Sequence, residues 1–300
     1  MYSMDKLNIY LLYIMTGYSM IKNNQKINQL GHNQQTILNT TIINNDKLNV
    51  VMVHSNPFNY AIRDKLALQF KERMLLYPNV NLIIVELVYG NKHFKITDKN
   101  NINHVQLRTS IENVMWHKEN MLNIGVKRLL QNEPNYKNVC FIDCDIHFDN
   151  IHWVDDTLKL LSSYDIIQMF NICLDLDSNG ETMACYHSFA YQYHHHKKLF
   201  SSGQTNYSHS GYAWAFTRHA YNKIKYFYDK GIIGSGDYYF ILFLINRNPL
   251  SNDYTKEYIK DVDEYRKNLI NFRITYIPSL IRYFYHGKNT TGTMIPAIQY

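Results

Sequence analysis

Two aspartates one residue apart, Asp143 and Asp145, follow the apolar run Val-Cys-Phe-Ile at residues 139–142. Carboxylate oxygens are the ligands that hard cations such as Mg²⁺ and Mn²⁺ prefer, and a cation held by them can also bind a diphosphate. An apolar run of this length predicts a buried strand, and ligands of open α/β sheets gather at the carboxyl ends of strands. The pair therefore predicts a site for a metal ion and a phosphorylated ligand.

Two further segments could complete such a site. His286 could ligate Mn²⁺, and Lys288, two residues later, could neutralise a phosphate. In Gly-Ser-Gly-Asp at residues 234–237, Gly236 lets the backbone approach a ligand closely, and Asp237 stands where a helix begins. A carboxylate in that position can act as general base towards a hydroxyl. Both segments also have plainer interpretations, a surface histidine and a helix N-cap.

Hydrophobic periodicity predicts the elements that position these residues. We expect strands over 49–53, 81–88, 139–142, 165–170, 211–217 and 281–286, and helices over 60–76, 115–130, 154–161, 218–228, 237–245 and 256–269. Strands that alternate with helices favour an α/β fold with a mostly parallel, Rossmann-like central sheet flanked by helices. We expect a single large domain over residues 48–300, preceded by an Asn-rich extension over residues 1–47.

Composition narrows the class of protein. The net charge of +6 comes without a concentrated basic stripe, which argues against a nucleic acid partner. The N-terminal apolar run at residues 9–15 is shorter than the ~20 residues of a membrane span, so we expect none. The four cysteines form no CxxC pair, which favours a reducing compartment and a cytoplasmic location. The abundance of Asn, Ile, Lys and Tyr is typical of an AT-rich genome, viral or microbial.

Several segments, in order along the chain, match the pattern of one known family. They are Asn-Pro-Phe at 56–58, Lys-Glu-Asn-Met-Leu-Asn-Ile-Gly at 118–125, the strand with Asp143 and Asp145, Gly-Tyr-Ala-Trp-Ala-Phe-Thr at 211–217, Gly-Ser-Gly-Asp at 234–237 and Tyr-Phe-Tyr-His at 283–286. They resemble the β-1,4-galactosyltransferase family's Pro-Phe-Arg-Asn turn, its Arg-Ala-Lys-Leu-Leu-Asn-Val-Gly helix, and its Asp-Val-Asp, Gly-Gly-Val-Ser-Ala-Leu, Gly-Gly-Glu-Asp and Met-Ile-Arg-His segments.

The resemblance implies a GT-A fold glycosyltransferase that uses a nucleotide sugar, usually a UDP-sugar, together with Mn²⁺. On this chain it implies that Asp145 and His286 ligate the metal and that Asp143 faces the ribose and sugar of the donor. Asp237 would deprotonate the acceptor hydroxyl for direct attack with inversion, and Lys118 takes the place of an arginine that helps to bind the donor.

Departures from the family pattern concern the acceptor and the metal. The family's Trp before Gly-Gly-Glu-Asp is Ile233 here and its Glu is Gly236, two positions that help to hold the acceptor sugar. The acceptor could therefore be a glycan, a protein or a small-molecule hydroxyl. The family's Met at the third metal position is Tyr283, so the metal preference could differ, with Mg²⁺ as the other choice. Trp214 is the best candidate for stacking on a sugar.

Two other functions remain open from the sequence. A phosphatase of the haloacid dehalogenase type also has Asp-x-Asp after a strand, with one Asp as nucleophile. That motif usually opens its domain, whereas here two strands and two helices precede Asp143. A non-catalytic protein that binds a nucleotide or a sugar on the same fold is the second alternative, although it would not need the base Asp237.

Overall fold

The computed structural model describes residues 46–195, 208–231, 234–247 and 255–286. Nearly all of the expected extension over residues 1–47 lies outside the described residues, so the domain boundary stays a prediction. Lys288, Ile233 and His196 also lie outside them. Among the described residues no helix has the length and apolar character that a membrane span requires.

A seven-stranded sheet forms the centre of the described residues, in the order β10-β6-β9-β4-β1-β2-β3. Four of its six neighbouring pairs are parallel, and β9 runs antiparallel to both of its neighbours. Its strands are β1 (Leu48–Ser55), β2 (Val80–Tyr89), β3 (His104–Thr109), β4 (Asn138–Ile142), β6 (Ile166–Gln168), β9 (Ala213–Thr217) and β10 (Ile274–Tyr276).

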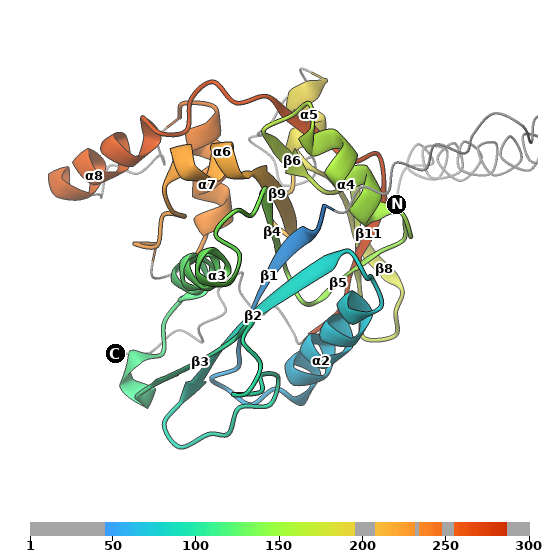
Figure 1. Ribbon diagram of the computed structural model, residues 1–300, viewed down its shortest axis with the longest axis vertical. Coiled ribbons are helices and arrows are strands. Elements are labelled where there is room, and N and C mark those ends of the chain that lie inside the picture. Colours follow the sequence, from blue (N-terminus) through green and yellow to red (C-terminus); the bar gives the residue numbers. More distant parts are fainter. Residues whose placement is uncertain (1–45, 196–207, 232–233, 248–254, 287–300) are drawn as a thin grey trace, which may run out of the picture. The chain divides into compact units, whose positions relative to one another are not determined.

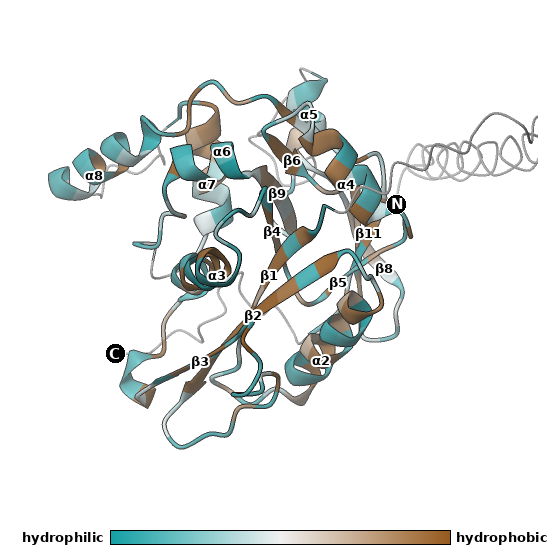
Figure 2. Ribbon diagram, viewed as in Figure 1, coloured by the Kyte–Doolittle hydropathy of each residue, from teal (hydrophilic) through white to brown (hydrophobic). Residues whose placement is uncertain are grey.

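Helices cover both faces of this sheet (Figure 1). They are α2 (Ala61–Leu75), α3 (Lys118–Asn132), α4 (Trp153–Leu161), α5 (Phe189–His194), α6 (Arg218–Ile224), α7 (Gly236–Leu244) and α8 (Lys256–Arg266). The alternation of β1 decides which helix meets which face: Val51 packs in one core with α3, α6 and α7, whereas Val50 and Met52 pack in another with α2 and α4. The strands β1 and β2 are accordingly hydrophobic in Figure 2.

Helix α3 lies unusually close to the sheet at Gly125. A Cβ at this position would lie 2.4 Å from a methyl carbon of Val51 on β1, so only glycine allows this approach. The close packing fixes the first turn of α3, where Lys118 and Glu119 stand, relative to the carboxyl ends of the strands.

A second, four-stranded sheet has the order β5-β11-β7-β8. Its strands are β5 (Ile146–Phe148), β7 (Ile172–Leu176), β8 (Thr182–His187) and β11 (Leu280–Tyr283). Strand β5 begins directly after Asp145 and pairs antiparallel with β11, with Tyr283 opposite Ile146. The pairing of β11 with β5 therefore brings the segment that ends at His286 close to Asp143 and Asp145.

The predicted fold class is confirmed: a mixed α/β chain with a mostly parallel central sheet and helices on both faces. Each predicted strand and helix is present, although α6 ends at Ile224, four residues early, where Lys225 has a positive φ of 72°. Strands β3, β5 and β10 and helix α5 were not expected.

Candidate active site

The acidic pair stands where the two sheets meet. The backbone N–H of Asp143 donates to Tyr212 O at 2.8 Å, which ties the end of β4 to the start of β9. Asp145 O accepts the backbone N–H of Phe284 at 2.8 Å, which ties the pair to the end of β11. As a result His286 Nε2 lies 3.5 Å from Asp145 Oδ2, although the two residues are far apart in the sequence.

The carboxylate of Asp145 is poorly compensated in the protein alone. Its Oδ1 atom is buried and has no hydrogen-bond partner. Burial, together with the charge of Asp143, raises the pKa of Asp145 to about 7, and the positive charges of Arg63 and Lys118 oppose that shift. A divalent cation would supply the missing charge, so this oxygen fits a metal ligand.

His286 contributes the nitrogen donor on the same side. Burial lowers the pKa of His286, which favours the neutral form that can ligate a metal. The hydroxyl of Tyr283 hydrogen-bonds to His286 Nε2, so metal binding there would displace this contact. No three His, Cys, Asp or Glu side chains among the described residues converge as a ready-made metal site. Asp145 and His286 are therefore the two residues that would hold a metal, whereas Asp143 is held by another partner.

That partner is Lys118, from the first turn of α3. Its Nζ lies 2.6 Å from Asp143 Oδ1 and 2.8 Å from Oδ2. Burial by itself lowers the pKa of Lys118, but the charges of Asp143 and Asp237 outweigh it and raise the pKa. Lys118 is therefore a cation that is paired with Asp143 and stabilised in addition by the charge of Asp237.

Asp237 is the second residue of α7, and Ser235, in the left-handed region at φ 67°, is the N-cap. Asp237 Oδ1 accepts the backbone N–H of Tyr238 at 2.9 Å. A Cβ on Gly211 would lie 2.3 Å from Asp237 Oδ2, so the glycine keeps this space for the carboxylate. Asp237, Lys118 and Asp143 line one cavity, and their shared role in a site stays a prediction.

Glu119 belongs to the same cluster and was missed from the sequence. It is 6% exposed, and its burial, opposed by Lys118 and Trp116 and assisted by the charge of Asp237, raises its pKa to about 7. A Cβ on Gly236 would lie 2.1 Å from Glu119 Oε1. The one sequence signal for Glu119 was its acidic type directly after Lys118, in the segment 118–125 that resembles the family helix.

His209 and Tyr212 are two further residues that the sequence did not single out. Gly211 N–H donates to His209 Nδ1 at 3.1 Å, and burial lowers the pKa of His209 to about 3. His209 is therefore neutral, with its proton on Nε2. Its ring stacks on that of Tyr212 with 3.8 Å between the centroids, and Tyr212 OH donates to Asp175 Oδ1 at 2.9 Å.

A small cavity of about 40 Å³ is lined by polar side chains of this region, namely Lys118, Glu119, Asp143, Tyr212 and Asp237. Trp214 lines its apolar wall but is 5% exposed, and its indole N–H donates to Ser210 O at 2.8 Å. Trp116 is only half-buried and lies near Gly234. Of the two tryptophans, Trp116 therefore has more ring surface for a ligand.

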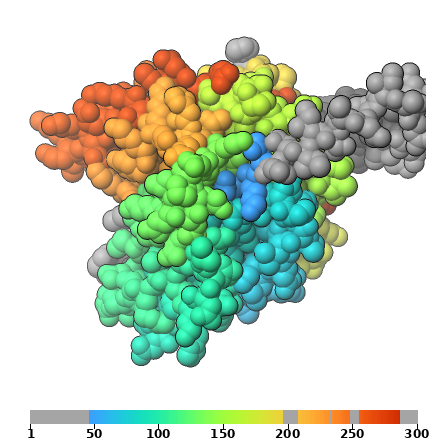
Figure 3. All heavy atoms as spheres, in the orientation of Figure 1, coloured from blue at the N-terminus to red at the C-terminus, as the bar shows by residue number. Residues whose placement is uncertain are grey.

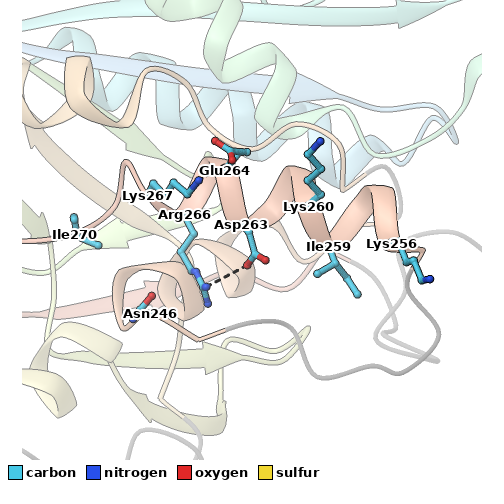
Figure 4. A pocket seen from close by; sticks show the side chains of 9 residues that line it. All are labelled: Asn246, Lys256, Ile259, Lys260, Asp263, Glu264, Arg266, Lys267 and Ile270. Atoms are coloured by element: carbon cyan, nitrogen blue, oxygen red, sulfur yellow. Dashed lines mark hydrogen bonds and ion pairs between the residues drawn. The ribbon is translucent and has the colours of Figure 1, made fainter.

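A larger cavity, about 610 Å³, lies elsewhere, along α8. Its side chains point away from the helix in different directions, and Arg266 pairs with Asp263 at 3.1 Å (Figure 4). Helix α8 lies at the edge of the face in Figure 3, away from the blue and cyan strands. This groove is lined by side chains of both charges and contains neither Asp143, Asp145 nor Asp237. The larger of the two cavities is therefore not the candidate active site.

The remaining predicted residues lie outside the cluster or outside the described residues. Lys288, predicted to bind a phosphate, is among the residues that are not described. The chain also has consecutive histidines at the end of α5, where His194 is the last residue of the helix and His195 Nε2 hydrogen-bonds with Tyr276 OH at 2.9 Å.

No protein-family model matches the chain, and no curated protein matches it. Solved structures resemble it remotely. The mannosyltransferase PcManGT of Pyrobaculum calidifontis, in complex with GDP-Man and Mn²⁺, is 11% identical with a TM-score of 0.41, over 81% of this chain and 58% of its own. The catalytic domain of Drosophila β1,4-galactosyltransferase 7, in complex with xylobiose, is 11% identical with a TM-score of 0.37, over 77% of this chain and 64% of its own.

A glycosyltransferase involved in glycosylation of the major capsid of PBCV-1 is 10% identical with a TM-score of 0.33, over 77% of this chain and 81% of its own. The chain spans less than two thirds of the length of the mannosyltransferase and of the Drosophila domain. At such distances the likeness says nothing about activity, and the side chains of the site must carry any functional conclusion.

Proposed function

We propose that the chain is a metal-dependent glycosyltransferase of the GT-A type that moves a sugar from a nucleotide sugar to a hydroxyl acceptor. One observation carries the proposal: Lys118, which pairs with Asp143 at the carboxyl end of β4, lines one cavity together with a second carboxylate, Asp237. An acidic pair alone would suit many metal proteins. A separate carboxylate in the same cavity suits a reaction with two substrates.

The donor half of the reaction rests on Asp145, His286 and Asp143. Asp145 and His286 would hold Mn²⁺ or Mg²⁺, which when bound would offset the negative charge that grows on the departing diphosphate. The unpartnered Oδ1 of Asp145 and the nearby imidazole support this assignment. Asp143, held by Lys118, would face the ribose and sugar of a donor, for which a UDP-sugar is our expectation.

Asp237 would act on the acceptor. Its carboxylate takes the proton of the acceptor hydroxyl while the hydroxyl oxygen bonds to the anomeric carbon of the donor sugar. The bond from that carbon to the diphosphate oxygen breaks, and a nucleoside diphosphate leaves. Because the hydroxyl attacks directly, the anomeric configuration inverts.

The test is to incubate the full chain with Mn²⁺ or Mg²⁺ and a panel of nucleotide sugars, and to follow the release of nucleoside diphosphate. We expect metal-dependent release with one donor and suppression by a chelator. Release of inorganic phosphate from small phosphate esters would instead support the phosphatase of the haloacid dehalogenase type. Nucleotide binding without turnover by any donor and acceptor would support a non-catalytic binding protein.

A further inference from the structure

Glu119 occupies the space that a side chain at position 236 would take. An ideal Cβ on Gly236 would lie 2.1 Å from Glu119 Oε1, 2.3 Å from its Cδ and 2.7 Å from its Cγ. These distances are far inside van der Waals contact, so position 236 can carry a side chain only if Glu119 moves. One carboxylate from α3 thus fills the space beside the first turn of α7.

The carboxylate of Glu119 is aimed at the same cavity as the base Asp237. Both residues line it, together with Lys118 and Asp143. Lys118 is already bound by Asp143 at 2.6 Å, so a single cation serves several carboxylates. A buried carboxylate with shared compensation gains most from a further hydrogen-bond donor, which a ligand in the cavity can bring.

The sequence patterns are consistent with an exchange of two side chains. In the family segments that this chain resembles, alanine stands at the position of Glu119 and glutamate at the position of Gly236. Here the acid is on α3 and the small residue on α7. Since the two positions touch, a carboxylate at either position would occupy the same space beside Asp237.

We infer that Glu119 is a specificity-determining residue for the acceptor. Its carboxylate accepts a hydrogen bond from a second hydroxyl of the acceptor, next to the hydroxyl that Asp237 deprotonates. The acceptor class is therefore a sugar-like molecule with two neighbouring hydroxyls. This inference rests on the proposed function, because it assigns a role within the acceptor side of that reaction.

The packing underneath the inference can be tested without substrates. Gly236→Ala places a Cβ against Glu119 and should lower the melting temperature by several degrees, as overpacking of a filled space does. The same change in a Glu119→Ala background should cost much less, because the space is then free. Equal losses in the two backgrounds would show that Glu119 does not occupy it and would overturn the inference.

The functional test uses methyl glycosides of glucose, galactose, mannose, xylose and N-acetylglucosamine as acceptor probes at pH 8. The probe is the glycoside that most accelerates nucleoside diphosphate release by the wild-type chain over release to water. Glu119→Gln, which keeps the size of the side chain, and Glu119→Ala should each raise the KM for that probe about tenfold or more. The reason is that each variant loses one charge-assisted hydrogen bond to the acceptor. The KM for the donor should change less than twofold, and the exposed Glu133→Ala is the matched control.

A rescue separates recognition from general damage. Gly236→Glu in the Glu119→Ala background returns a carboxylate to the same space and should recover most of the acceptor affinity. Unchanged acceptor KM in both Glu119 variants would overturn the inference, as would a wild-type chain that hydrolyses the donor but is accelerated by none of the glycosides. A wild-type chain that turns over no nucleotide sugar would instead refute the proposed function, and the inference with it.

Discussion

The two halves of the candidate site are built in different ways. The acidic-pair half, Asp143, Asp145 and His286, lies on the ends of strands that hydrogen bonds between backbones hold together. The helix half, Glu119 and Asp237, lies on the first turns of α3 and α7, which meet through side chains and the glycine at 236. The end of a strand is held in place by hydrogen bonds to the neighbouring strands. Where two helix turns touch, a side chain from either helix can fill the space between them. The half expected to bind the metal and donor keeps the two aspartates and the histidine of the segments it resembles but departs from them at Tyr283, and the half expected to choose the acceptor departs from them at Glu119 and Gly236.

The largest effect is expected from the acidic-pair half. Asp145→Asn removes a charge that the metal needs, and should lower metal-dependent turnover roughly a hundredfold or more and abolish the Mn²⁺-dependent part of UDP binding. Turnover assays and titration calorimetry with and without Mn²⁺ measure both.

The control for this variant is Asp149→Asn, because Asp149 pairs with Arg282 at 2.8 Å on the neighbouring strand. It should change turnover less than twofold. Since burial raises the pKa of Asp145 to about 7, its charge opposes folding at pH 8, and Asp145→Asn should not lower the melting temperature in a chelator. Full Mn²⁺-dependent UDP affinity in Asp145→Asn would remove this residue from the metal site.

In the helix half, Asp237→Asn should leave donor affinity close to that of the wild type and lower the rate of transfer about a thousandfold, within the range for loss of a general base. The variant keeps the oxygen that accepts the Tyr238 N–H, so α7 should still form. Single-turnover measurements with saturating donor isolate the transfer step. Asp261→Asn, which breaks a surface pair with Lys230, is the control, and normal transfer by Asp237→Asn would rule out its role as base.

A smaller effect concerns how stability depends on pH. Glu119 has its pKa raised from 4.5 to about 7, so between these values the folded chain holds a proton that the unfolded chain has released. Its contribution to stability is therefore full below pH 4.5 and falls as the pH rises to 7, by roughly 3 kcal/mol at about 1.4 kcal/mol per pKa unit.

Glu119→Gln removes this titration, so its unfolding free energy should fall less between pH 5 and pH 7.5 than that of the wild type. Urea unfolding in a chelator measures both curves, with Glu133→Gln as the surface control. Parallel curves for wild type and Glu119→Gln would mean that Glu119 titrates normally.

The same contrast explains what the sequence could predict. Asp143 and Asp145 follow a continuous apolar run, so their place at a strand end could be read from neighbouring residues, and the sheet confirms that strand. The contact between Glu119 and Gly236 joins two elements far apart in the sequence, and neither residue type indicates a partner. Strand β3 was missed because its alternation is short, with Val105 and Leu107 as its two apolar residues, although parallel pairing with β2 stabilises it.

The smallest effect is expected on α8, whose groove is far larger than the cavity at Asp237. Ile259→Ser and Lys260→Ala alter exposed side chains on the groove, and exposed substitutions away from buried networks usually change stability by less than about 0.5 kcal/mol. Both variants should keep donor and acceptor kcat/KM within twofold of the wild type. A tenfold rise in acceptor KM in either variant would extend acceptor recognition to α8, and the division between a strand-built donor half and a helix-built acceptor half would then include a third element.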